Sequence, residues 1–130
     1  MAFILDAERD AGAFARYAAY LEAQCAQFPP LAYELATSDW YFDARDHRCP
    51  HDGWLESAQL VETAGALALT VRLRAAYHDG TIELHYPGIV SYAFEGTAVE
   101  RGHRDWRYDE LRVDAHGRLE HEIEWSGTAT

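Results

Sequence analysis

The first part of the chain repeats apolar residues with the period of an α-helix. Through residues 7–27 an apolar side chain recurs every three or four positions, which places one stripe on one face. This spacing predicts an amphipathic helix over Ala7–Gln27, with Asp6 as its N-cap and Pro29-Pro30 as its end. The stripe consists of Phe14, Tyr17, Ala18, Leu21, Cys25 and Phe28.

After this helix the pattern becomes irregular and then changes its period. Residues 31–42 are too mixed to predict an element, and the polar, turn-rich residues 43–53 predict a loop. From Trp54 onward the apolar residues alternate, which predicts strands separated by short turns. No later helical pattern is long enough to form a crossover between parallel strands, so we expect an antiparallel arrangement.

The clearest hairpin has its turn at Asp79-Gly80. A two-residue turn at this point would pair Leu73 with Tyr86 and set apolar residues opposite apolar residues along both strands. The chain is then expected to turn at Pro87-Gly88 into a further strand over residues 89–94. A polar connection follows this strand.

The last hairpin is expected to join residues 105–113 to residues 118–125 through a four-residue link. This register would set Glu110 opposite His121 on an aromatic face of the sheet. The apolar residues of the other face would then meet charged partners. A bulge near residues 109–110, which would shift the register by one residue, is therefore the alternative.

These elements predict an α+β fold in one domain that spans residues 1–130. The N-terminal helix would pack on one face of a five- to six-stranded antiparallel meander sheet, because its apolar stripe must be buried against an alternating strand face. The core expected from both patterns comprises Phe14, Leu21, Leu69, Val71, Leu73, Ile82, Leu84, Tyr108, Ile123 and Trp125.

Charge then narrows the classes of partner. The 130 residues include 22 Asp and Glu against 11 basic residues, all of them Arg, which gives a net charge of −11. Such a field repels phosphate, so nucleic acid is not an expected ligand, and it attracts a basic protein or a cation. The hydrophobic share of 48% is sufficient for a folded core, which excludes a disordered chain.

Location follows from what the sequence lacks. No stretch approaches the ~20 apolar residues of a membrane helix, and the first residues lack the basic start and apolar run of a signal peptide. We therefore expect a cytoplasmic protein with no membrane contact. In that reducing compartment Cys25 and Cys49 are expected to be free thiols.

One candidate site lies on the last hairpin. Glu110 and His121, with Asp109 beside them, place carboxylates next to an imidazole, which is the arrangement of a general base or of a satisfied pair in the core. The chain contains no Ser/His/Asp order, glycine-rich phosphate loop or His-Glu-x-x-His helix. No cofactor is therefore expected.

Two further clusters precede the strands. The stretch His47, Cys49, His51 and Asp52 contains ligand types that Zn²⁺ prefers, but a second pair of ligands is missing, so a polar loop is the alternative to a metal site. The second cluster is an acidic, aromatic-rich set that suits a protein-interaction surface or, alternatively, packs under the helix. Its members are Asp39, Trp40, Tyr41, Asp43, Asp46 and Trp54.

A resemblance adds to this interpretation. The stretches over residues 50–56, 77–86, 105–110 and 121–123 resemble those of a group of small bacterial α+β proteins, of which some acidic members are similar to immunity partners of secreted toxins. The resemblance implies a non-catalytic protein-binding or inhibitory module directed at a basic partner, and it carries over no catalytic residue. The alternative function is a small metal- or His/Glu-dependent enzyme or a small-ligand-binding protein.

Overall fold

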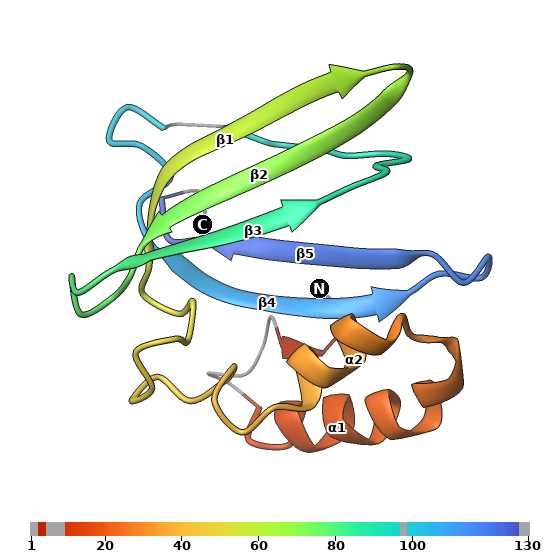
Figure 1. Cartoon of the computed structure of the whole chain (residues 1–130). Helices are drawn as coiled ribbons and strands as arrows, with labels where there is room; N and C mark the ends of the chain where they lie inside the picture. The colour runs from red at the N-terminus through yellow and green to blue at the C-terminus, as the bar shows by residue number, and fades with distance from the viewer. Residues whose placement is uncertain (1–2, 5–9, 97–98, 128–130) are drawn as a thin grey trace.

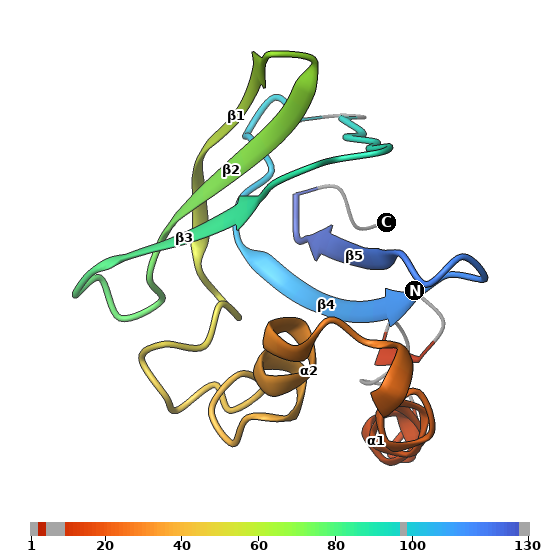
Figure 2. The ribbon, with the colours of Figure 1, turned by 45° about the vertical axis from the view of Figure 1, so that its right-hand side comes forward.

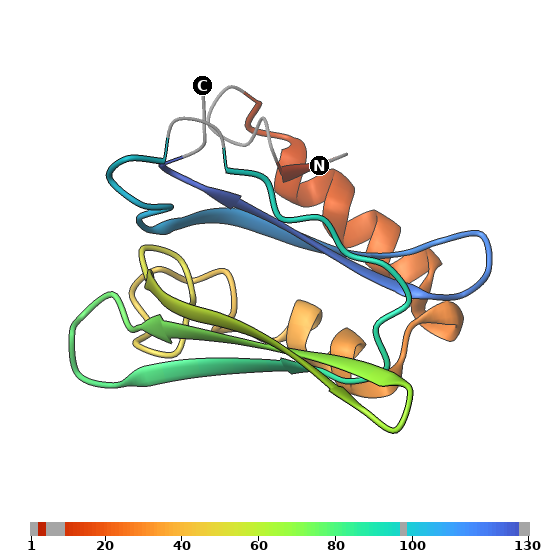
Figure 3. The same cartoon turned by 90° about the horizontal axis from the view of Figure 1, so that it is seen from above.

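The computed structural model describes residues 3–4, 10–96 and 99–127 and has an α+β architecture. Its strands form a three-stranded sheet, in the order β1-β2-β3, and a two-stranded sheet of β4 and β5, all antiparallel (Figure 1). Seen from above, the two-stranded sheet lies between helix α1 and the three-stranded sheet (Figure 3). The α+β class and the antiparallel strands are confirmed, whereas the expected single sheet of five or six strands is divided in two.

The helical region contains more than one element. Helix α1 (Ala13–Ala23) is followed by a 3₁₀ turn (Cys25–Gln27) and by α2 (Pro30–Thr37). The expected start at residue 7 and the Asp6 cap lie outside the described residues, and α1 begins after Gly12. Pro30 begins a helix instead of ending one, because the missing N–H of proline costs nothing at the first helical position.

Helix α1 buries a narrower stripe than the sequence predicts. Ala13, Tyr17 and Leu21 are buried at intervals of four residues. Phe14 is predicted in the core, but 42% of its surface is exposed. Phe14 follows Ala13 and so lies beside the buried stripe and not on it. Its ring packs against that of Phe42, with 5.9 Å between the ring centroids.

The three-stranded sheet consists of β1 (Trp54–Thr63), β2 (Ala66–Arg74) and β3 (Thr81–Tyr86). The turn between β1 and β2 has positive φ at both Ala64 and Gly65, as a tight two-residue hairpin requires. Between β2 and β3 the connection is longer than expected. Leu73 pairs with Ile82 instead of Tyr86, so the register differs from the prediction by four residues.

The longer connection has local causes. Within it, the N–H of His78 donates to the carbonyl of Ala75, and His78 adopts a φ of 59°. Tyr77 leaves the ladder, because its ring stacks on His47 at 4.0 Å and its hydroxyl donates to the carbonyl of Ala44. Because the shift is even, the inward-facing residues of both strands still share one face.

The two-stranded sheet consists of β4 (Trp106–Val113) and β5 (Leu119–Trp125). Trp106 pairs with Trp125 as expected, but a bulge between Trp106 and Tyr108 then sets Leu111 opposite His121. The alternative with a bulge and a one-residue shift is therefore the correct one, although the bulge lies nearer the start of β4 than residues 109–110. The link between the strands accordingly spans five residues, 114–118.

The two sheets meet at one corner. Trp54 at the start of β1 forms an isolated bridge with Asp105, and the N–H of Trp106 donates to the carbonyl of Gly53. Figure 2 shows the two sheets diverging from this corner. Residues 89–94, which are predicted to form a strand, are extended but belong to neither sheet.

Two apolar clusters form the core. One joins Tyr17 and Leu21 of α1 to Leu111 of β4, and the other joins Val71 and Leu73 of β2 to the indole rings of the second sheet. Trp106, absent from the expected core, is 1% exposed. Of the expected core, Leu21, Val71, Leu73 and Trp125 are buried, while Leu69, Tyr108, Ile82, Leu84 and Ile123 are partly buried.

Candidate functional site

The register of β4 and β5 separates the two residues that the sequence pairs in one site. Because Leu111 pairs with His121 and Glu110 pairs with Glu122, Glu110 and His121 lie on opposite faces of the sheet. The predicted contact between Glu110 and His121 is therefore wrong. Asp109, two positions before Leu111, lies on the same face as His121 and is its partner.

Asp109 is the centre of a buried hydrogen-bond network. Its Oδ2 accepts from the hydroxyl of Tyr41 at 2.6 Å and from Nε2 of His121 at 2.6 Å, and its Oδ1 accepts from the indole N–H of Trp106 at 3.1 Å. On the far side of the imidazole, the hydroxyl of Tyr86 lies 2.7 Å from Nδ1 of His121. The network thus connects β3, both strands of the second sheet and the loop after α2.

The chemistry of this network is that of a structural link. The His121 and Asp109 side chains are only 6% and 4% exposed, so a substrate has little access to either. Burial raises the pKa values of Tyr41 and Tyr86 above their ordinary range, which keeps both hydroxyls protonated and able to donate. The network holds the sheets and the loop together, since its hydrogen bonds join side chains of all three and satisfy both oxygens of Asp109.

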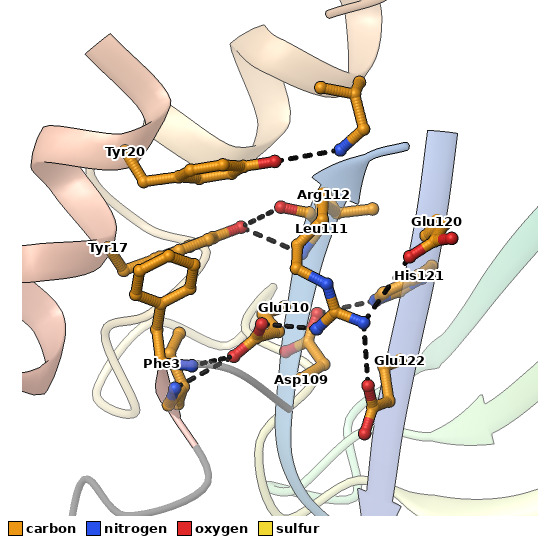
Figure 4. Close-up of polar contacts among 12 residues, drawn as sticks. Phe3, Tyr17, Tyr20, Asp109, Glu110, Leu111, Arg112, Glu120, His121 and Glu122 are labelled. Atoms are coloured by element: carbon orange, nitrogen blue, oxygen red, sulfur yellow. Dashed lines mark hydrogen bonds and ion pairs between the residues drawn. The ribbon is translucent and has the colours of Figure 1, made fainter. Parts of the chain in front are cut away.

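Glu110 is held on the opposite face by a different set of groups. Its Oε1 accepts from the backbone N–H groups of Phe3 and Ile4 at 2.9 Å each, and its other oxygen pairs with Arg112 (Figure 4). Because the Glu110 side chain is 0% exposed, its charge requires these donors. Glu110 therefore attaches the start of the chain to β4.

Arg112 connects this cluster to two glutamates of β5. Its guanidinium is shared by Glu110, Glu120 and Glu122, at 3.6 Å from Glu120 and 2.8 Å from Glu122 (Figure 4). Burial lowers the pKa of Arg112, but the hydrogen bonds to Glu122 and Glu110 outweigh burial and raise it overall. Further along β5, one oxygen of Glu124 is buried without a hydrogen-bond partner, and Arg107 lies 3.8 Å from the other oxygen.

The two outer edges of this sheet differ. On β4, the hydroxyl of Tyr17 accepts from the N–H of Leu111 and donates to its carbonyl, and the hydroxyl of Tyr20 accepts from the N–H of Val113. On the other side of the sheet, no described strand pairs with the outer edge of β5. Two tyrosines of α1 thus bond to three backbone groups of β4, whereas no described strand bonds to the outer edge of β5, which we call the open edge.

An extended segment runs on the open side of β5. Figures 1 and 3 show residues 89–96 on the side of β5 that faces away from β4. Every residue from Val90 to Gly96 is exposed, including Val90 at 70%, Tyr92 at 57% and Phe94 at 52%. The ring of Phe94 lies 4.7 Å from that of His103, which in turn lies 6.3 Å from that of Trp125. Within the described ranges, the backbone of 90–96 makes no hydrogen bond to other backbone groups.

The expected acidic and aromatic surface over residues 39–54 is neither uniformly exposed nor uniformly acidic. Tyr41 is buried against Asp109 and so is not a surface residue. Asp43 pairs with Arg45, and Asp46 pairs with Arg48. The local arginines neutralise two of the carboxylates.

The remaining members of this set stay at the surface. Asp39 is exposed, and Trp54 is exposed at 44%. The guanidinium of Arg48 lies 4.8 Å from the ring of Trp40, and that of Arg104 lies 5.9 Å from the ring of Trp54. A guanidinium therefore lies beside each tryptophan ring, which disfavours this region as an anchor for a basic partner.

The metal alternative has no geometric basis among the residues that the structure describes, where no three His, Cys, Asp or Glu side chains are arranged to hold an ion. His47 pairs with Asp79, and His51 donates through Nδ1 to the carbonyl of Arg107. Cys49 is a buried free thiol whose pKa burial raises to about 11. Cys25 is also free, as expected, and it is exposed.

A pocket of about 140 Å³ opens between α1, the loop of residues 41–51 and the start of β4. Sequence patterns do not indicate it, because its walls come from three distant segments and its rim includes Phe14, which the helical period assigns to the core. Its lining consists of Phe14, Tyr41, Phe42, Ala44, Cys49, His51, Trp106, Arg107, Tyr108 and Asp109.

None of the described helices is long and apolar enough to cross a membrane. Comparison of the chain with protein-family models, with curated proteins and with solved structures gave no match.

Proposed function

We propose that this protein is a non-catalytic binding module that captures a basic, extended segment of another protein along the open edge of β5. The observation that carries the proposal is the contrast between the two edges of the sheet. Tyrosine hydroxyls of α1 bond to the backbone of Leu111 and Val113 in β4, whereas no described strand pairs with the outer backbone of β5. An unpaired strand edge is a template for a further strand.

The side chains of β5 favour a basic partner. Glutamates occupy alternating positions 120, 122 and 124 and so share one face of the strand. Arg112 offsets only one of the charges of Glu110, Glu120 and Glu122, so this face keeps a surplus of negative charge. An added strand with Lys or Arg at alternating positions would place cations beside Glu120 and Glu124, at the spacing that favours cross-strand pairs of opposite charge.

The same charges disfavour pairing between two copies of this chain. An antiparallel β5–β5 pair would set the three glutamates of one copy against those of the other, and like charges that face each other across strands destabilise pairing. The apolar segment that carries Val90, Tyr92 and Phe94 lies on the same side and offers contact area to the partner. The net charge of −11 would speed the approach of a basic protein.

An inhibitory, immunity-like role remains a prediction, since a module that occupies a partner's basic segment can block the function of that partner. A cytoplasmic location also remains a prediction. The enzyme alternative loses its proposed pair, because Glu110 and His121 lie on opposite faces and Asp109 and His121 are buried. We therefore place the proposed interaction surface on β5 and residues 89–96, and not on residues 39–54 as the sequence predicts.

A designed peptide tests the proposal without knowledge of the natural partner. The probe is a heptapeptide of alternating Lys and Val, with the matching peptide of Glu and Val as its charge control. We expect the Lys peptide to shift the amide NMR signals of residues 119–125, with an affinity that falls as salt rises. Glu120→Gln with Glu124→Gln should weaken binding about tenfold, whereas Glu22→Gln with Glu34→Gln, on the helices, should change it less than about twofold.

Two results would overturn the proposal. The first is a peptide that shifts the signals of β1 or β3 in preference to those of β5. The second is an equal loss of binding in the two double variants, since that would show that net charge alone, and not the edge of β5, attracts the peptide.

A further inference from the structure

The pocket at the rim of α1 is separate from the open edge of β5 and carries an inference of its own. Six of its lining residues bear rings, contributed by the helix, the following loop and β4: Phe14, Tyr41, Phe42, His51, Trp106 and Tyr108. Several of these rings contact one another edge to face. Phe14 and Phe42 lie 5.9 Å apart at 68°, and Tyr41 and Phe42 lie 4.9 Å apart at 87°.

We propose that this pocket binds a single aromatic ring, as a small neutral compound of the size of phenol. The volume of about 140 Å³ fits this class, because a cavity of ~150 Å³ in a protein interior holds one benzene molecule. Ring walls favour an aromatic ligand over an aliphatic one of equal volume, because edge-to-face contacts add to the burial of apolar area.

The exposure of Phe14 supports an occupant at this place. Phe14 lies beside the buried stripe of α1 and lines the pocket, yet 42% of the residue is exposed. A ring seated in the pocket would cover Phe14 and Phe42 together. The aromatic wall thus provides the apolar area that binding would remove from water.

The polar groups of the pocket favour a neutral ligand. Both oxygens of Asp109 already accept from protein donors, so this carboxylate is not a free counter-ion for a cation. The thiol of Cys49 lies 3.0 Å from the carbonyl of Tyr41 and is protonated at neutral pH. Arg107, which also lines the pocket, further disfavours a cation.

The inference is tested by adding phenol to the full chain in steps and recording the NMR signals at each step. We expect saturable binding with a Kd on the order of 1 mM, and ring-current shifts confined to the lining residues. Cyclohexanol is the matched aliphatic probe and should bind at least about threefold more weakly. N-acetyltyrosinamide, which carries the same ring on a peptide backbone, should bind more weakly than phenol; binding as tight as that of phenol would overturn the assignment to a small compound and indicate an aromatic side chain of a partner.

Two variants locate the site. Phe14→Ala should weaken phenol binding about tenfold, and Ala44→Phe should abolish it by filling the pocket. Leu31→Ala removes another exposed apolar side chain from the helical region, outside the pocket, and should leave binding unchanged. Absence of phenol binding, or equal effects of Phe14→Ala and Leu31→Ala, would overturn the inference. The open-edge proposal is unaffected by either result, because no pocket residue belongs to β5.

Discussion

The hydroxyl of Tyr17 bonds to both backbone polar groups of Leu111. The N–H of Leu111 donates to the Tyr17 oxygen at 2.8 Å, and the same hydroxyl donates to the Leu111 carbonyl at 2.7 Å. A strand edge normally obtains such bonds from another strand. Here α1 supplies them from a side chain, so the helix both buries the apolar side of Tyr17 and closes the edge of β4.

Tyr17→Phe should therefore cost more than the loss of one ordinary hydrogen bond. The phenyl ring preserves the packing but leaves the N–H and carbonyl of buried Leu111 unpaired, and we expect the free energy of unfolding to fall by about 2–3 kcal/mol. Tyr20→Phe removes a partner from the N–H of Val113 alone and should cost about 1 kcal/mol. Urea unfolding measures both losses. Tyr92→Phe, at an exposed site, is the control, and an equal loss in all three variants would contradict the edge argument.

The pairing of His121 with Asp109 predicts which residues are coupled in energy. His121→Ala should destabilise the protein by about 3 kcal/mol, because it removes a donor from a buried carboxylate. In a double-mutant cycle with Asp109→Asn, the loss in the double variant should differ from the sum of the two single losses by about 1–3 kcal/mol. A cycle with Glu110→Gln should be additive within about 0.5 kcal/mol, since Glu110 lies on the other face. Coupling to Glu110 in place of Asp109 would contradict the observed register.

The sequence predicts the fold better than the site, because one hairpin is shifted from its predicted pairing by an even number of residues and the other by an odd number. The hairpin of β2 and β3 is displaced by four residues from its predicted pairing, an even number, so Leu73 and Ile82 still share the face that packs on the second cluster, as predicted. The hairpin of β4 and β5 is displaced by one. An odd shift moves the partner of every side chain to the other face, so His121 meets Asp109 instead of Glu110.

Other parts of the site depend on contacts that local patterns do not carry. Tyr41 lies 68 positions from Asp109 along the chain, and nothing in its flanking residues indicates that its hydroxyl is buried against a carboxylate. Asp43 and Asp46 count as surplus charge in a composition, whereas Arg45 and Arg48, two positions further on, neutralise them. Because each arginine follows its aspartate by two positions, this spacing in the sequence could have indicated the ion pairs and hence a less acidic surface.

Gly127 and Gly80 should differ in their tolerance of an added methyl group. A Cβ on Gly127 would lie 2.3 Å from the carbonyl oxygen of Gly102 and 2.7 Å from that of His103. These are backbone atoms that cannot move independently, so Gly127→Ala should lower the free energy of unfolding by about 1–3 kcal/mol. Gly80→Ala meets no atom within 4 Å, and the φ of Gly80 lies outside the left-handed region, so it should change stability by less than about 0.5 kcal/mol. Thermal unfolding compares them, and a tolerated Gly127→Ala would show that residues 102–103 do not pack against Gly127 in solution.

The buried thiol of Cys49 should make the protein less stable in alkali. Burial raises the pKa of Cys49 to about 11 in the folded protein, whereas an unfolded thiol titrates near its ordinary value of about 8.5. A raised folded pKa means that the thiol contributes its full stabilisation below about pH 8.5, and that this contribution is lost as the pH rises toward 11. Cys49→Ala lacks the titration but keeps every buried tyrosine, so it serves as the reference. The difference in free energy of unfolding between wild type and Cys49→Ala should shrink by about 1–2 kcal/mol between pH 7 and pH 10. Denaturant unfolding at the two pH values measures it, and a difference that stayed constant would show that water reaches the thiol in the folded protein.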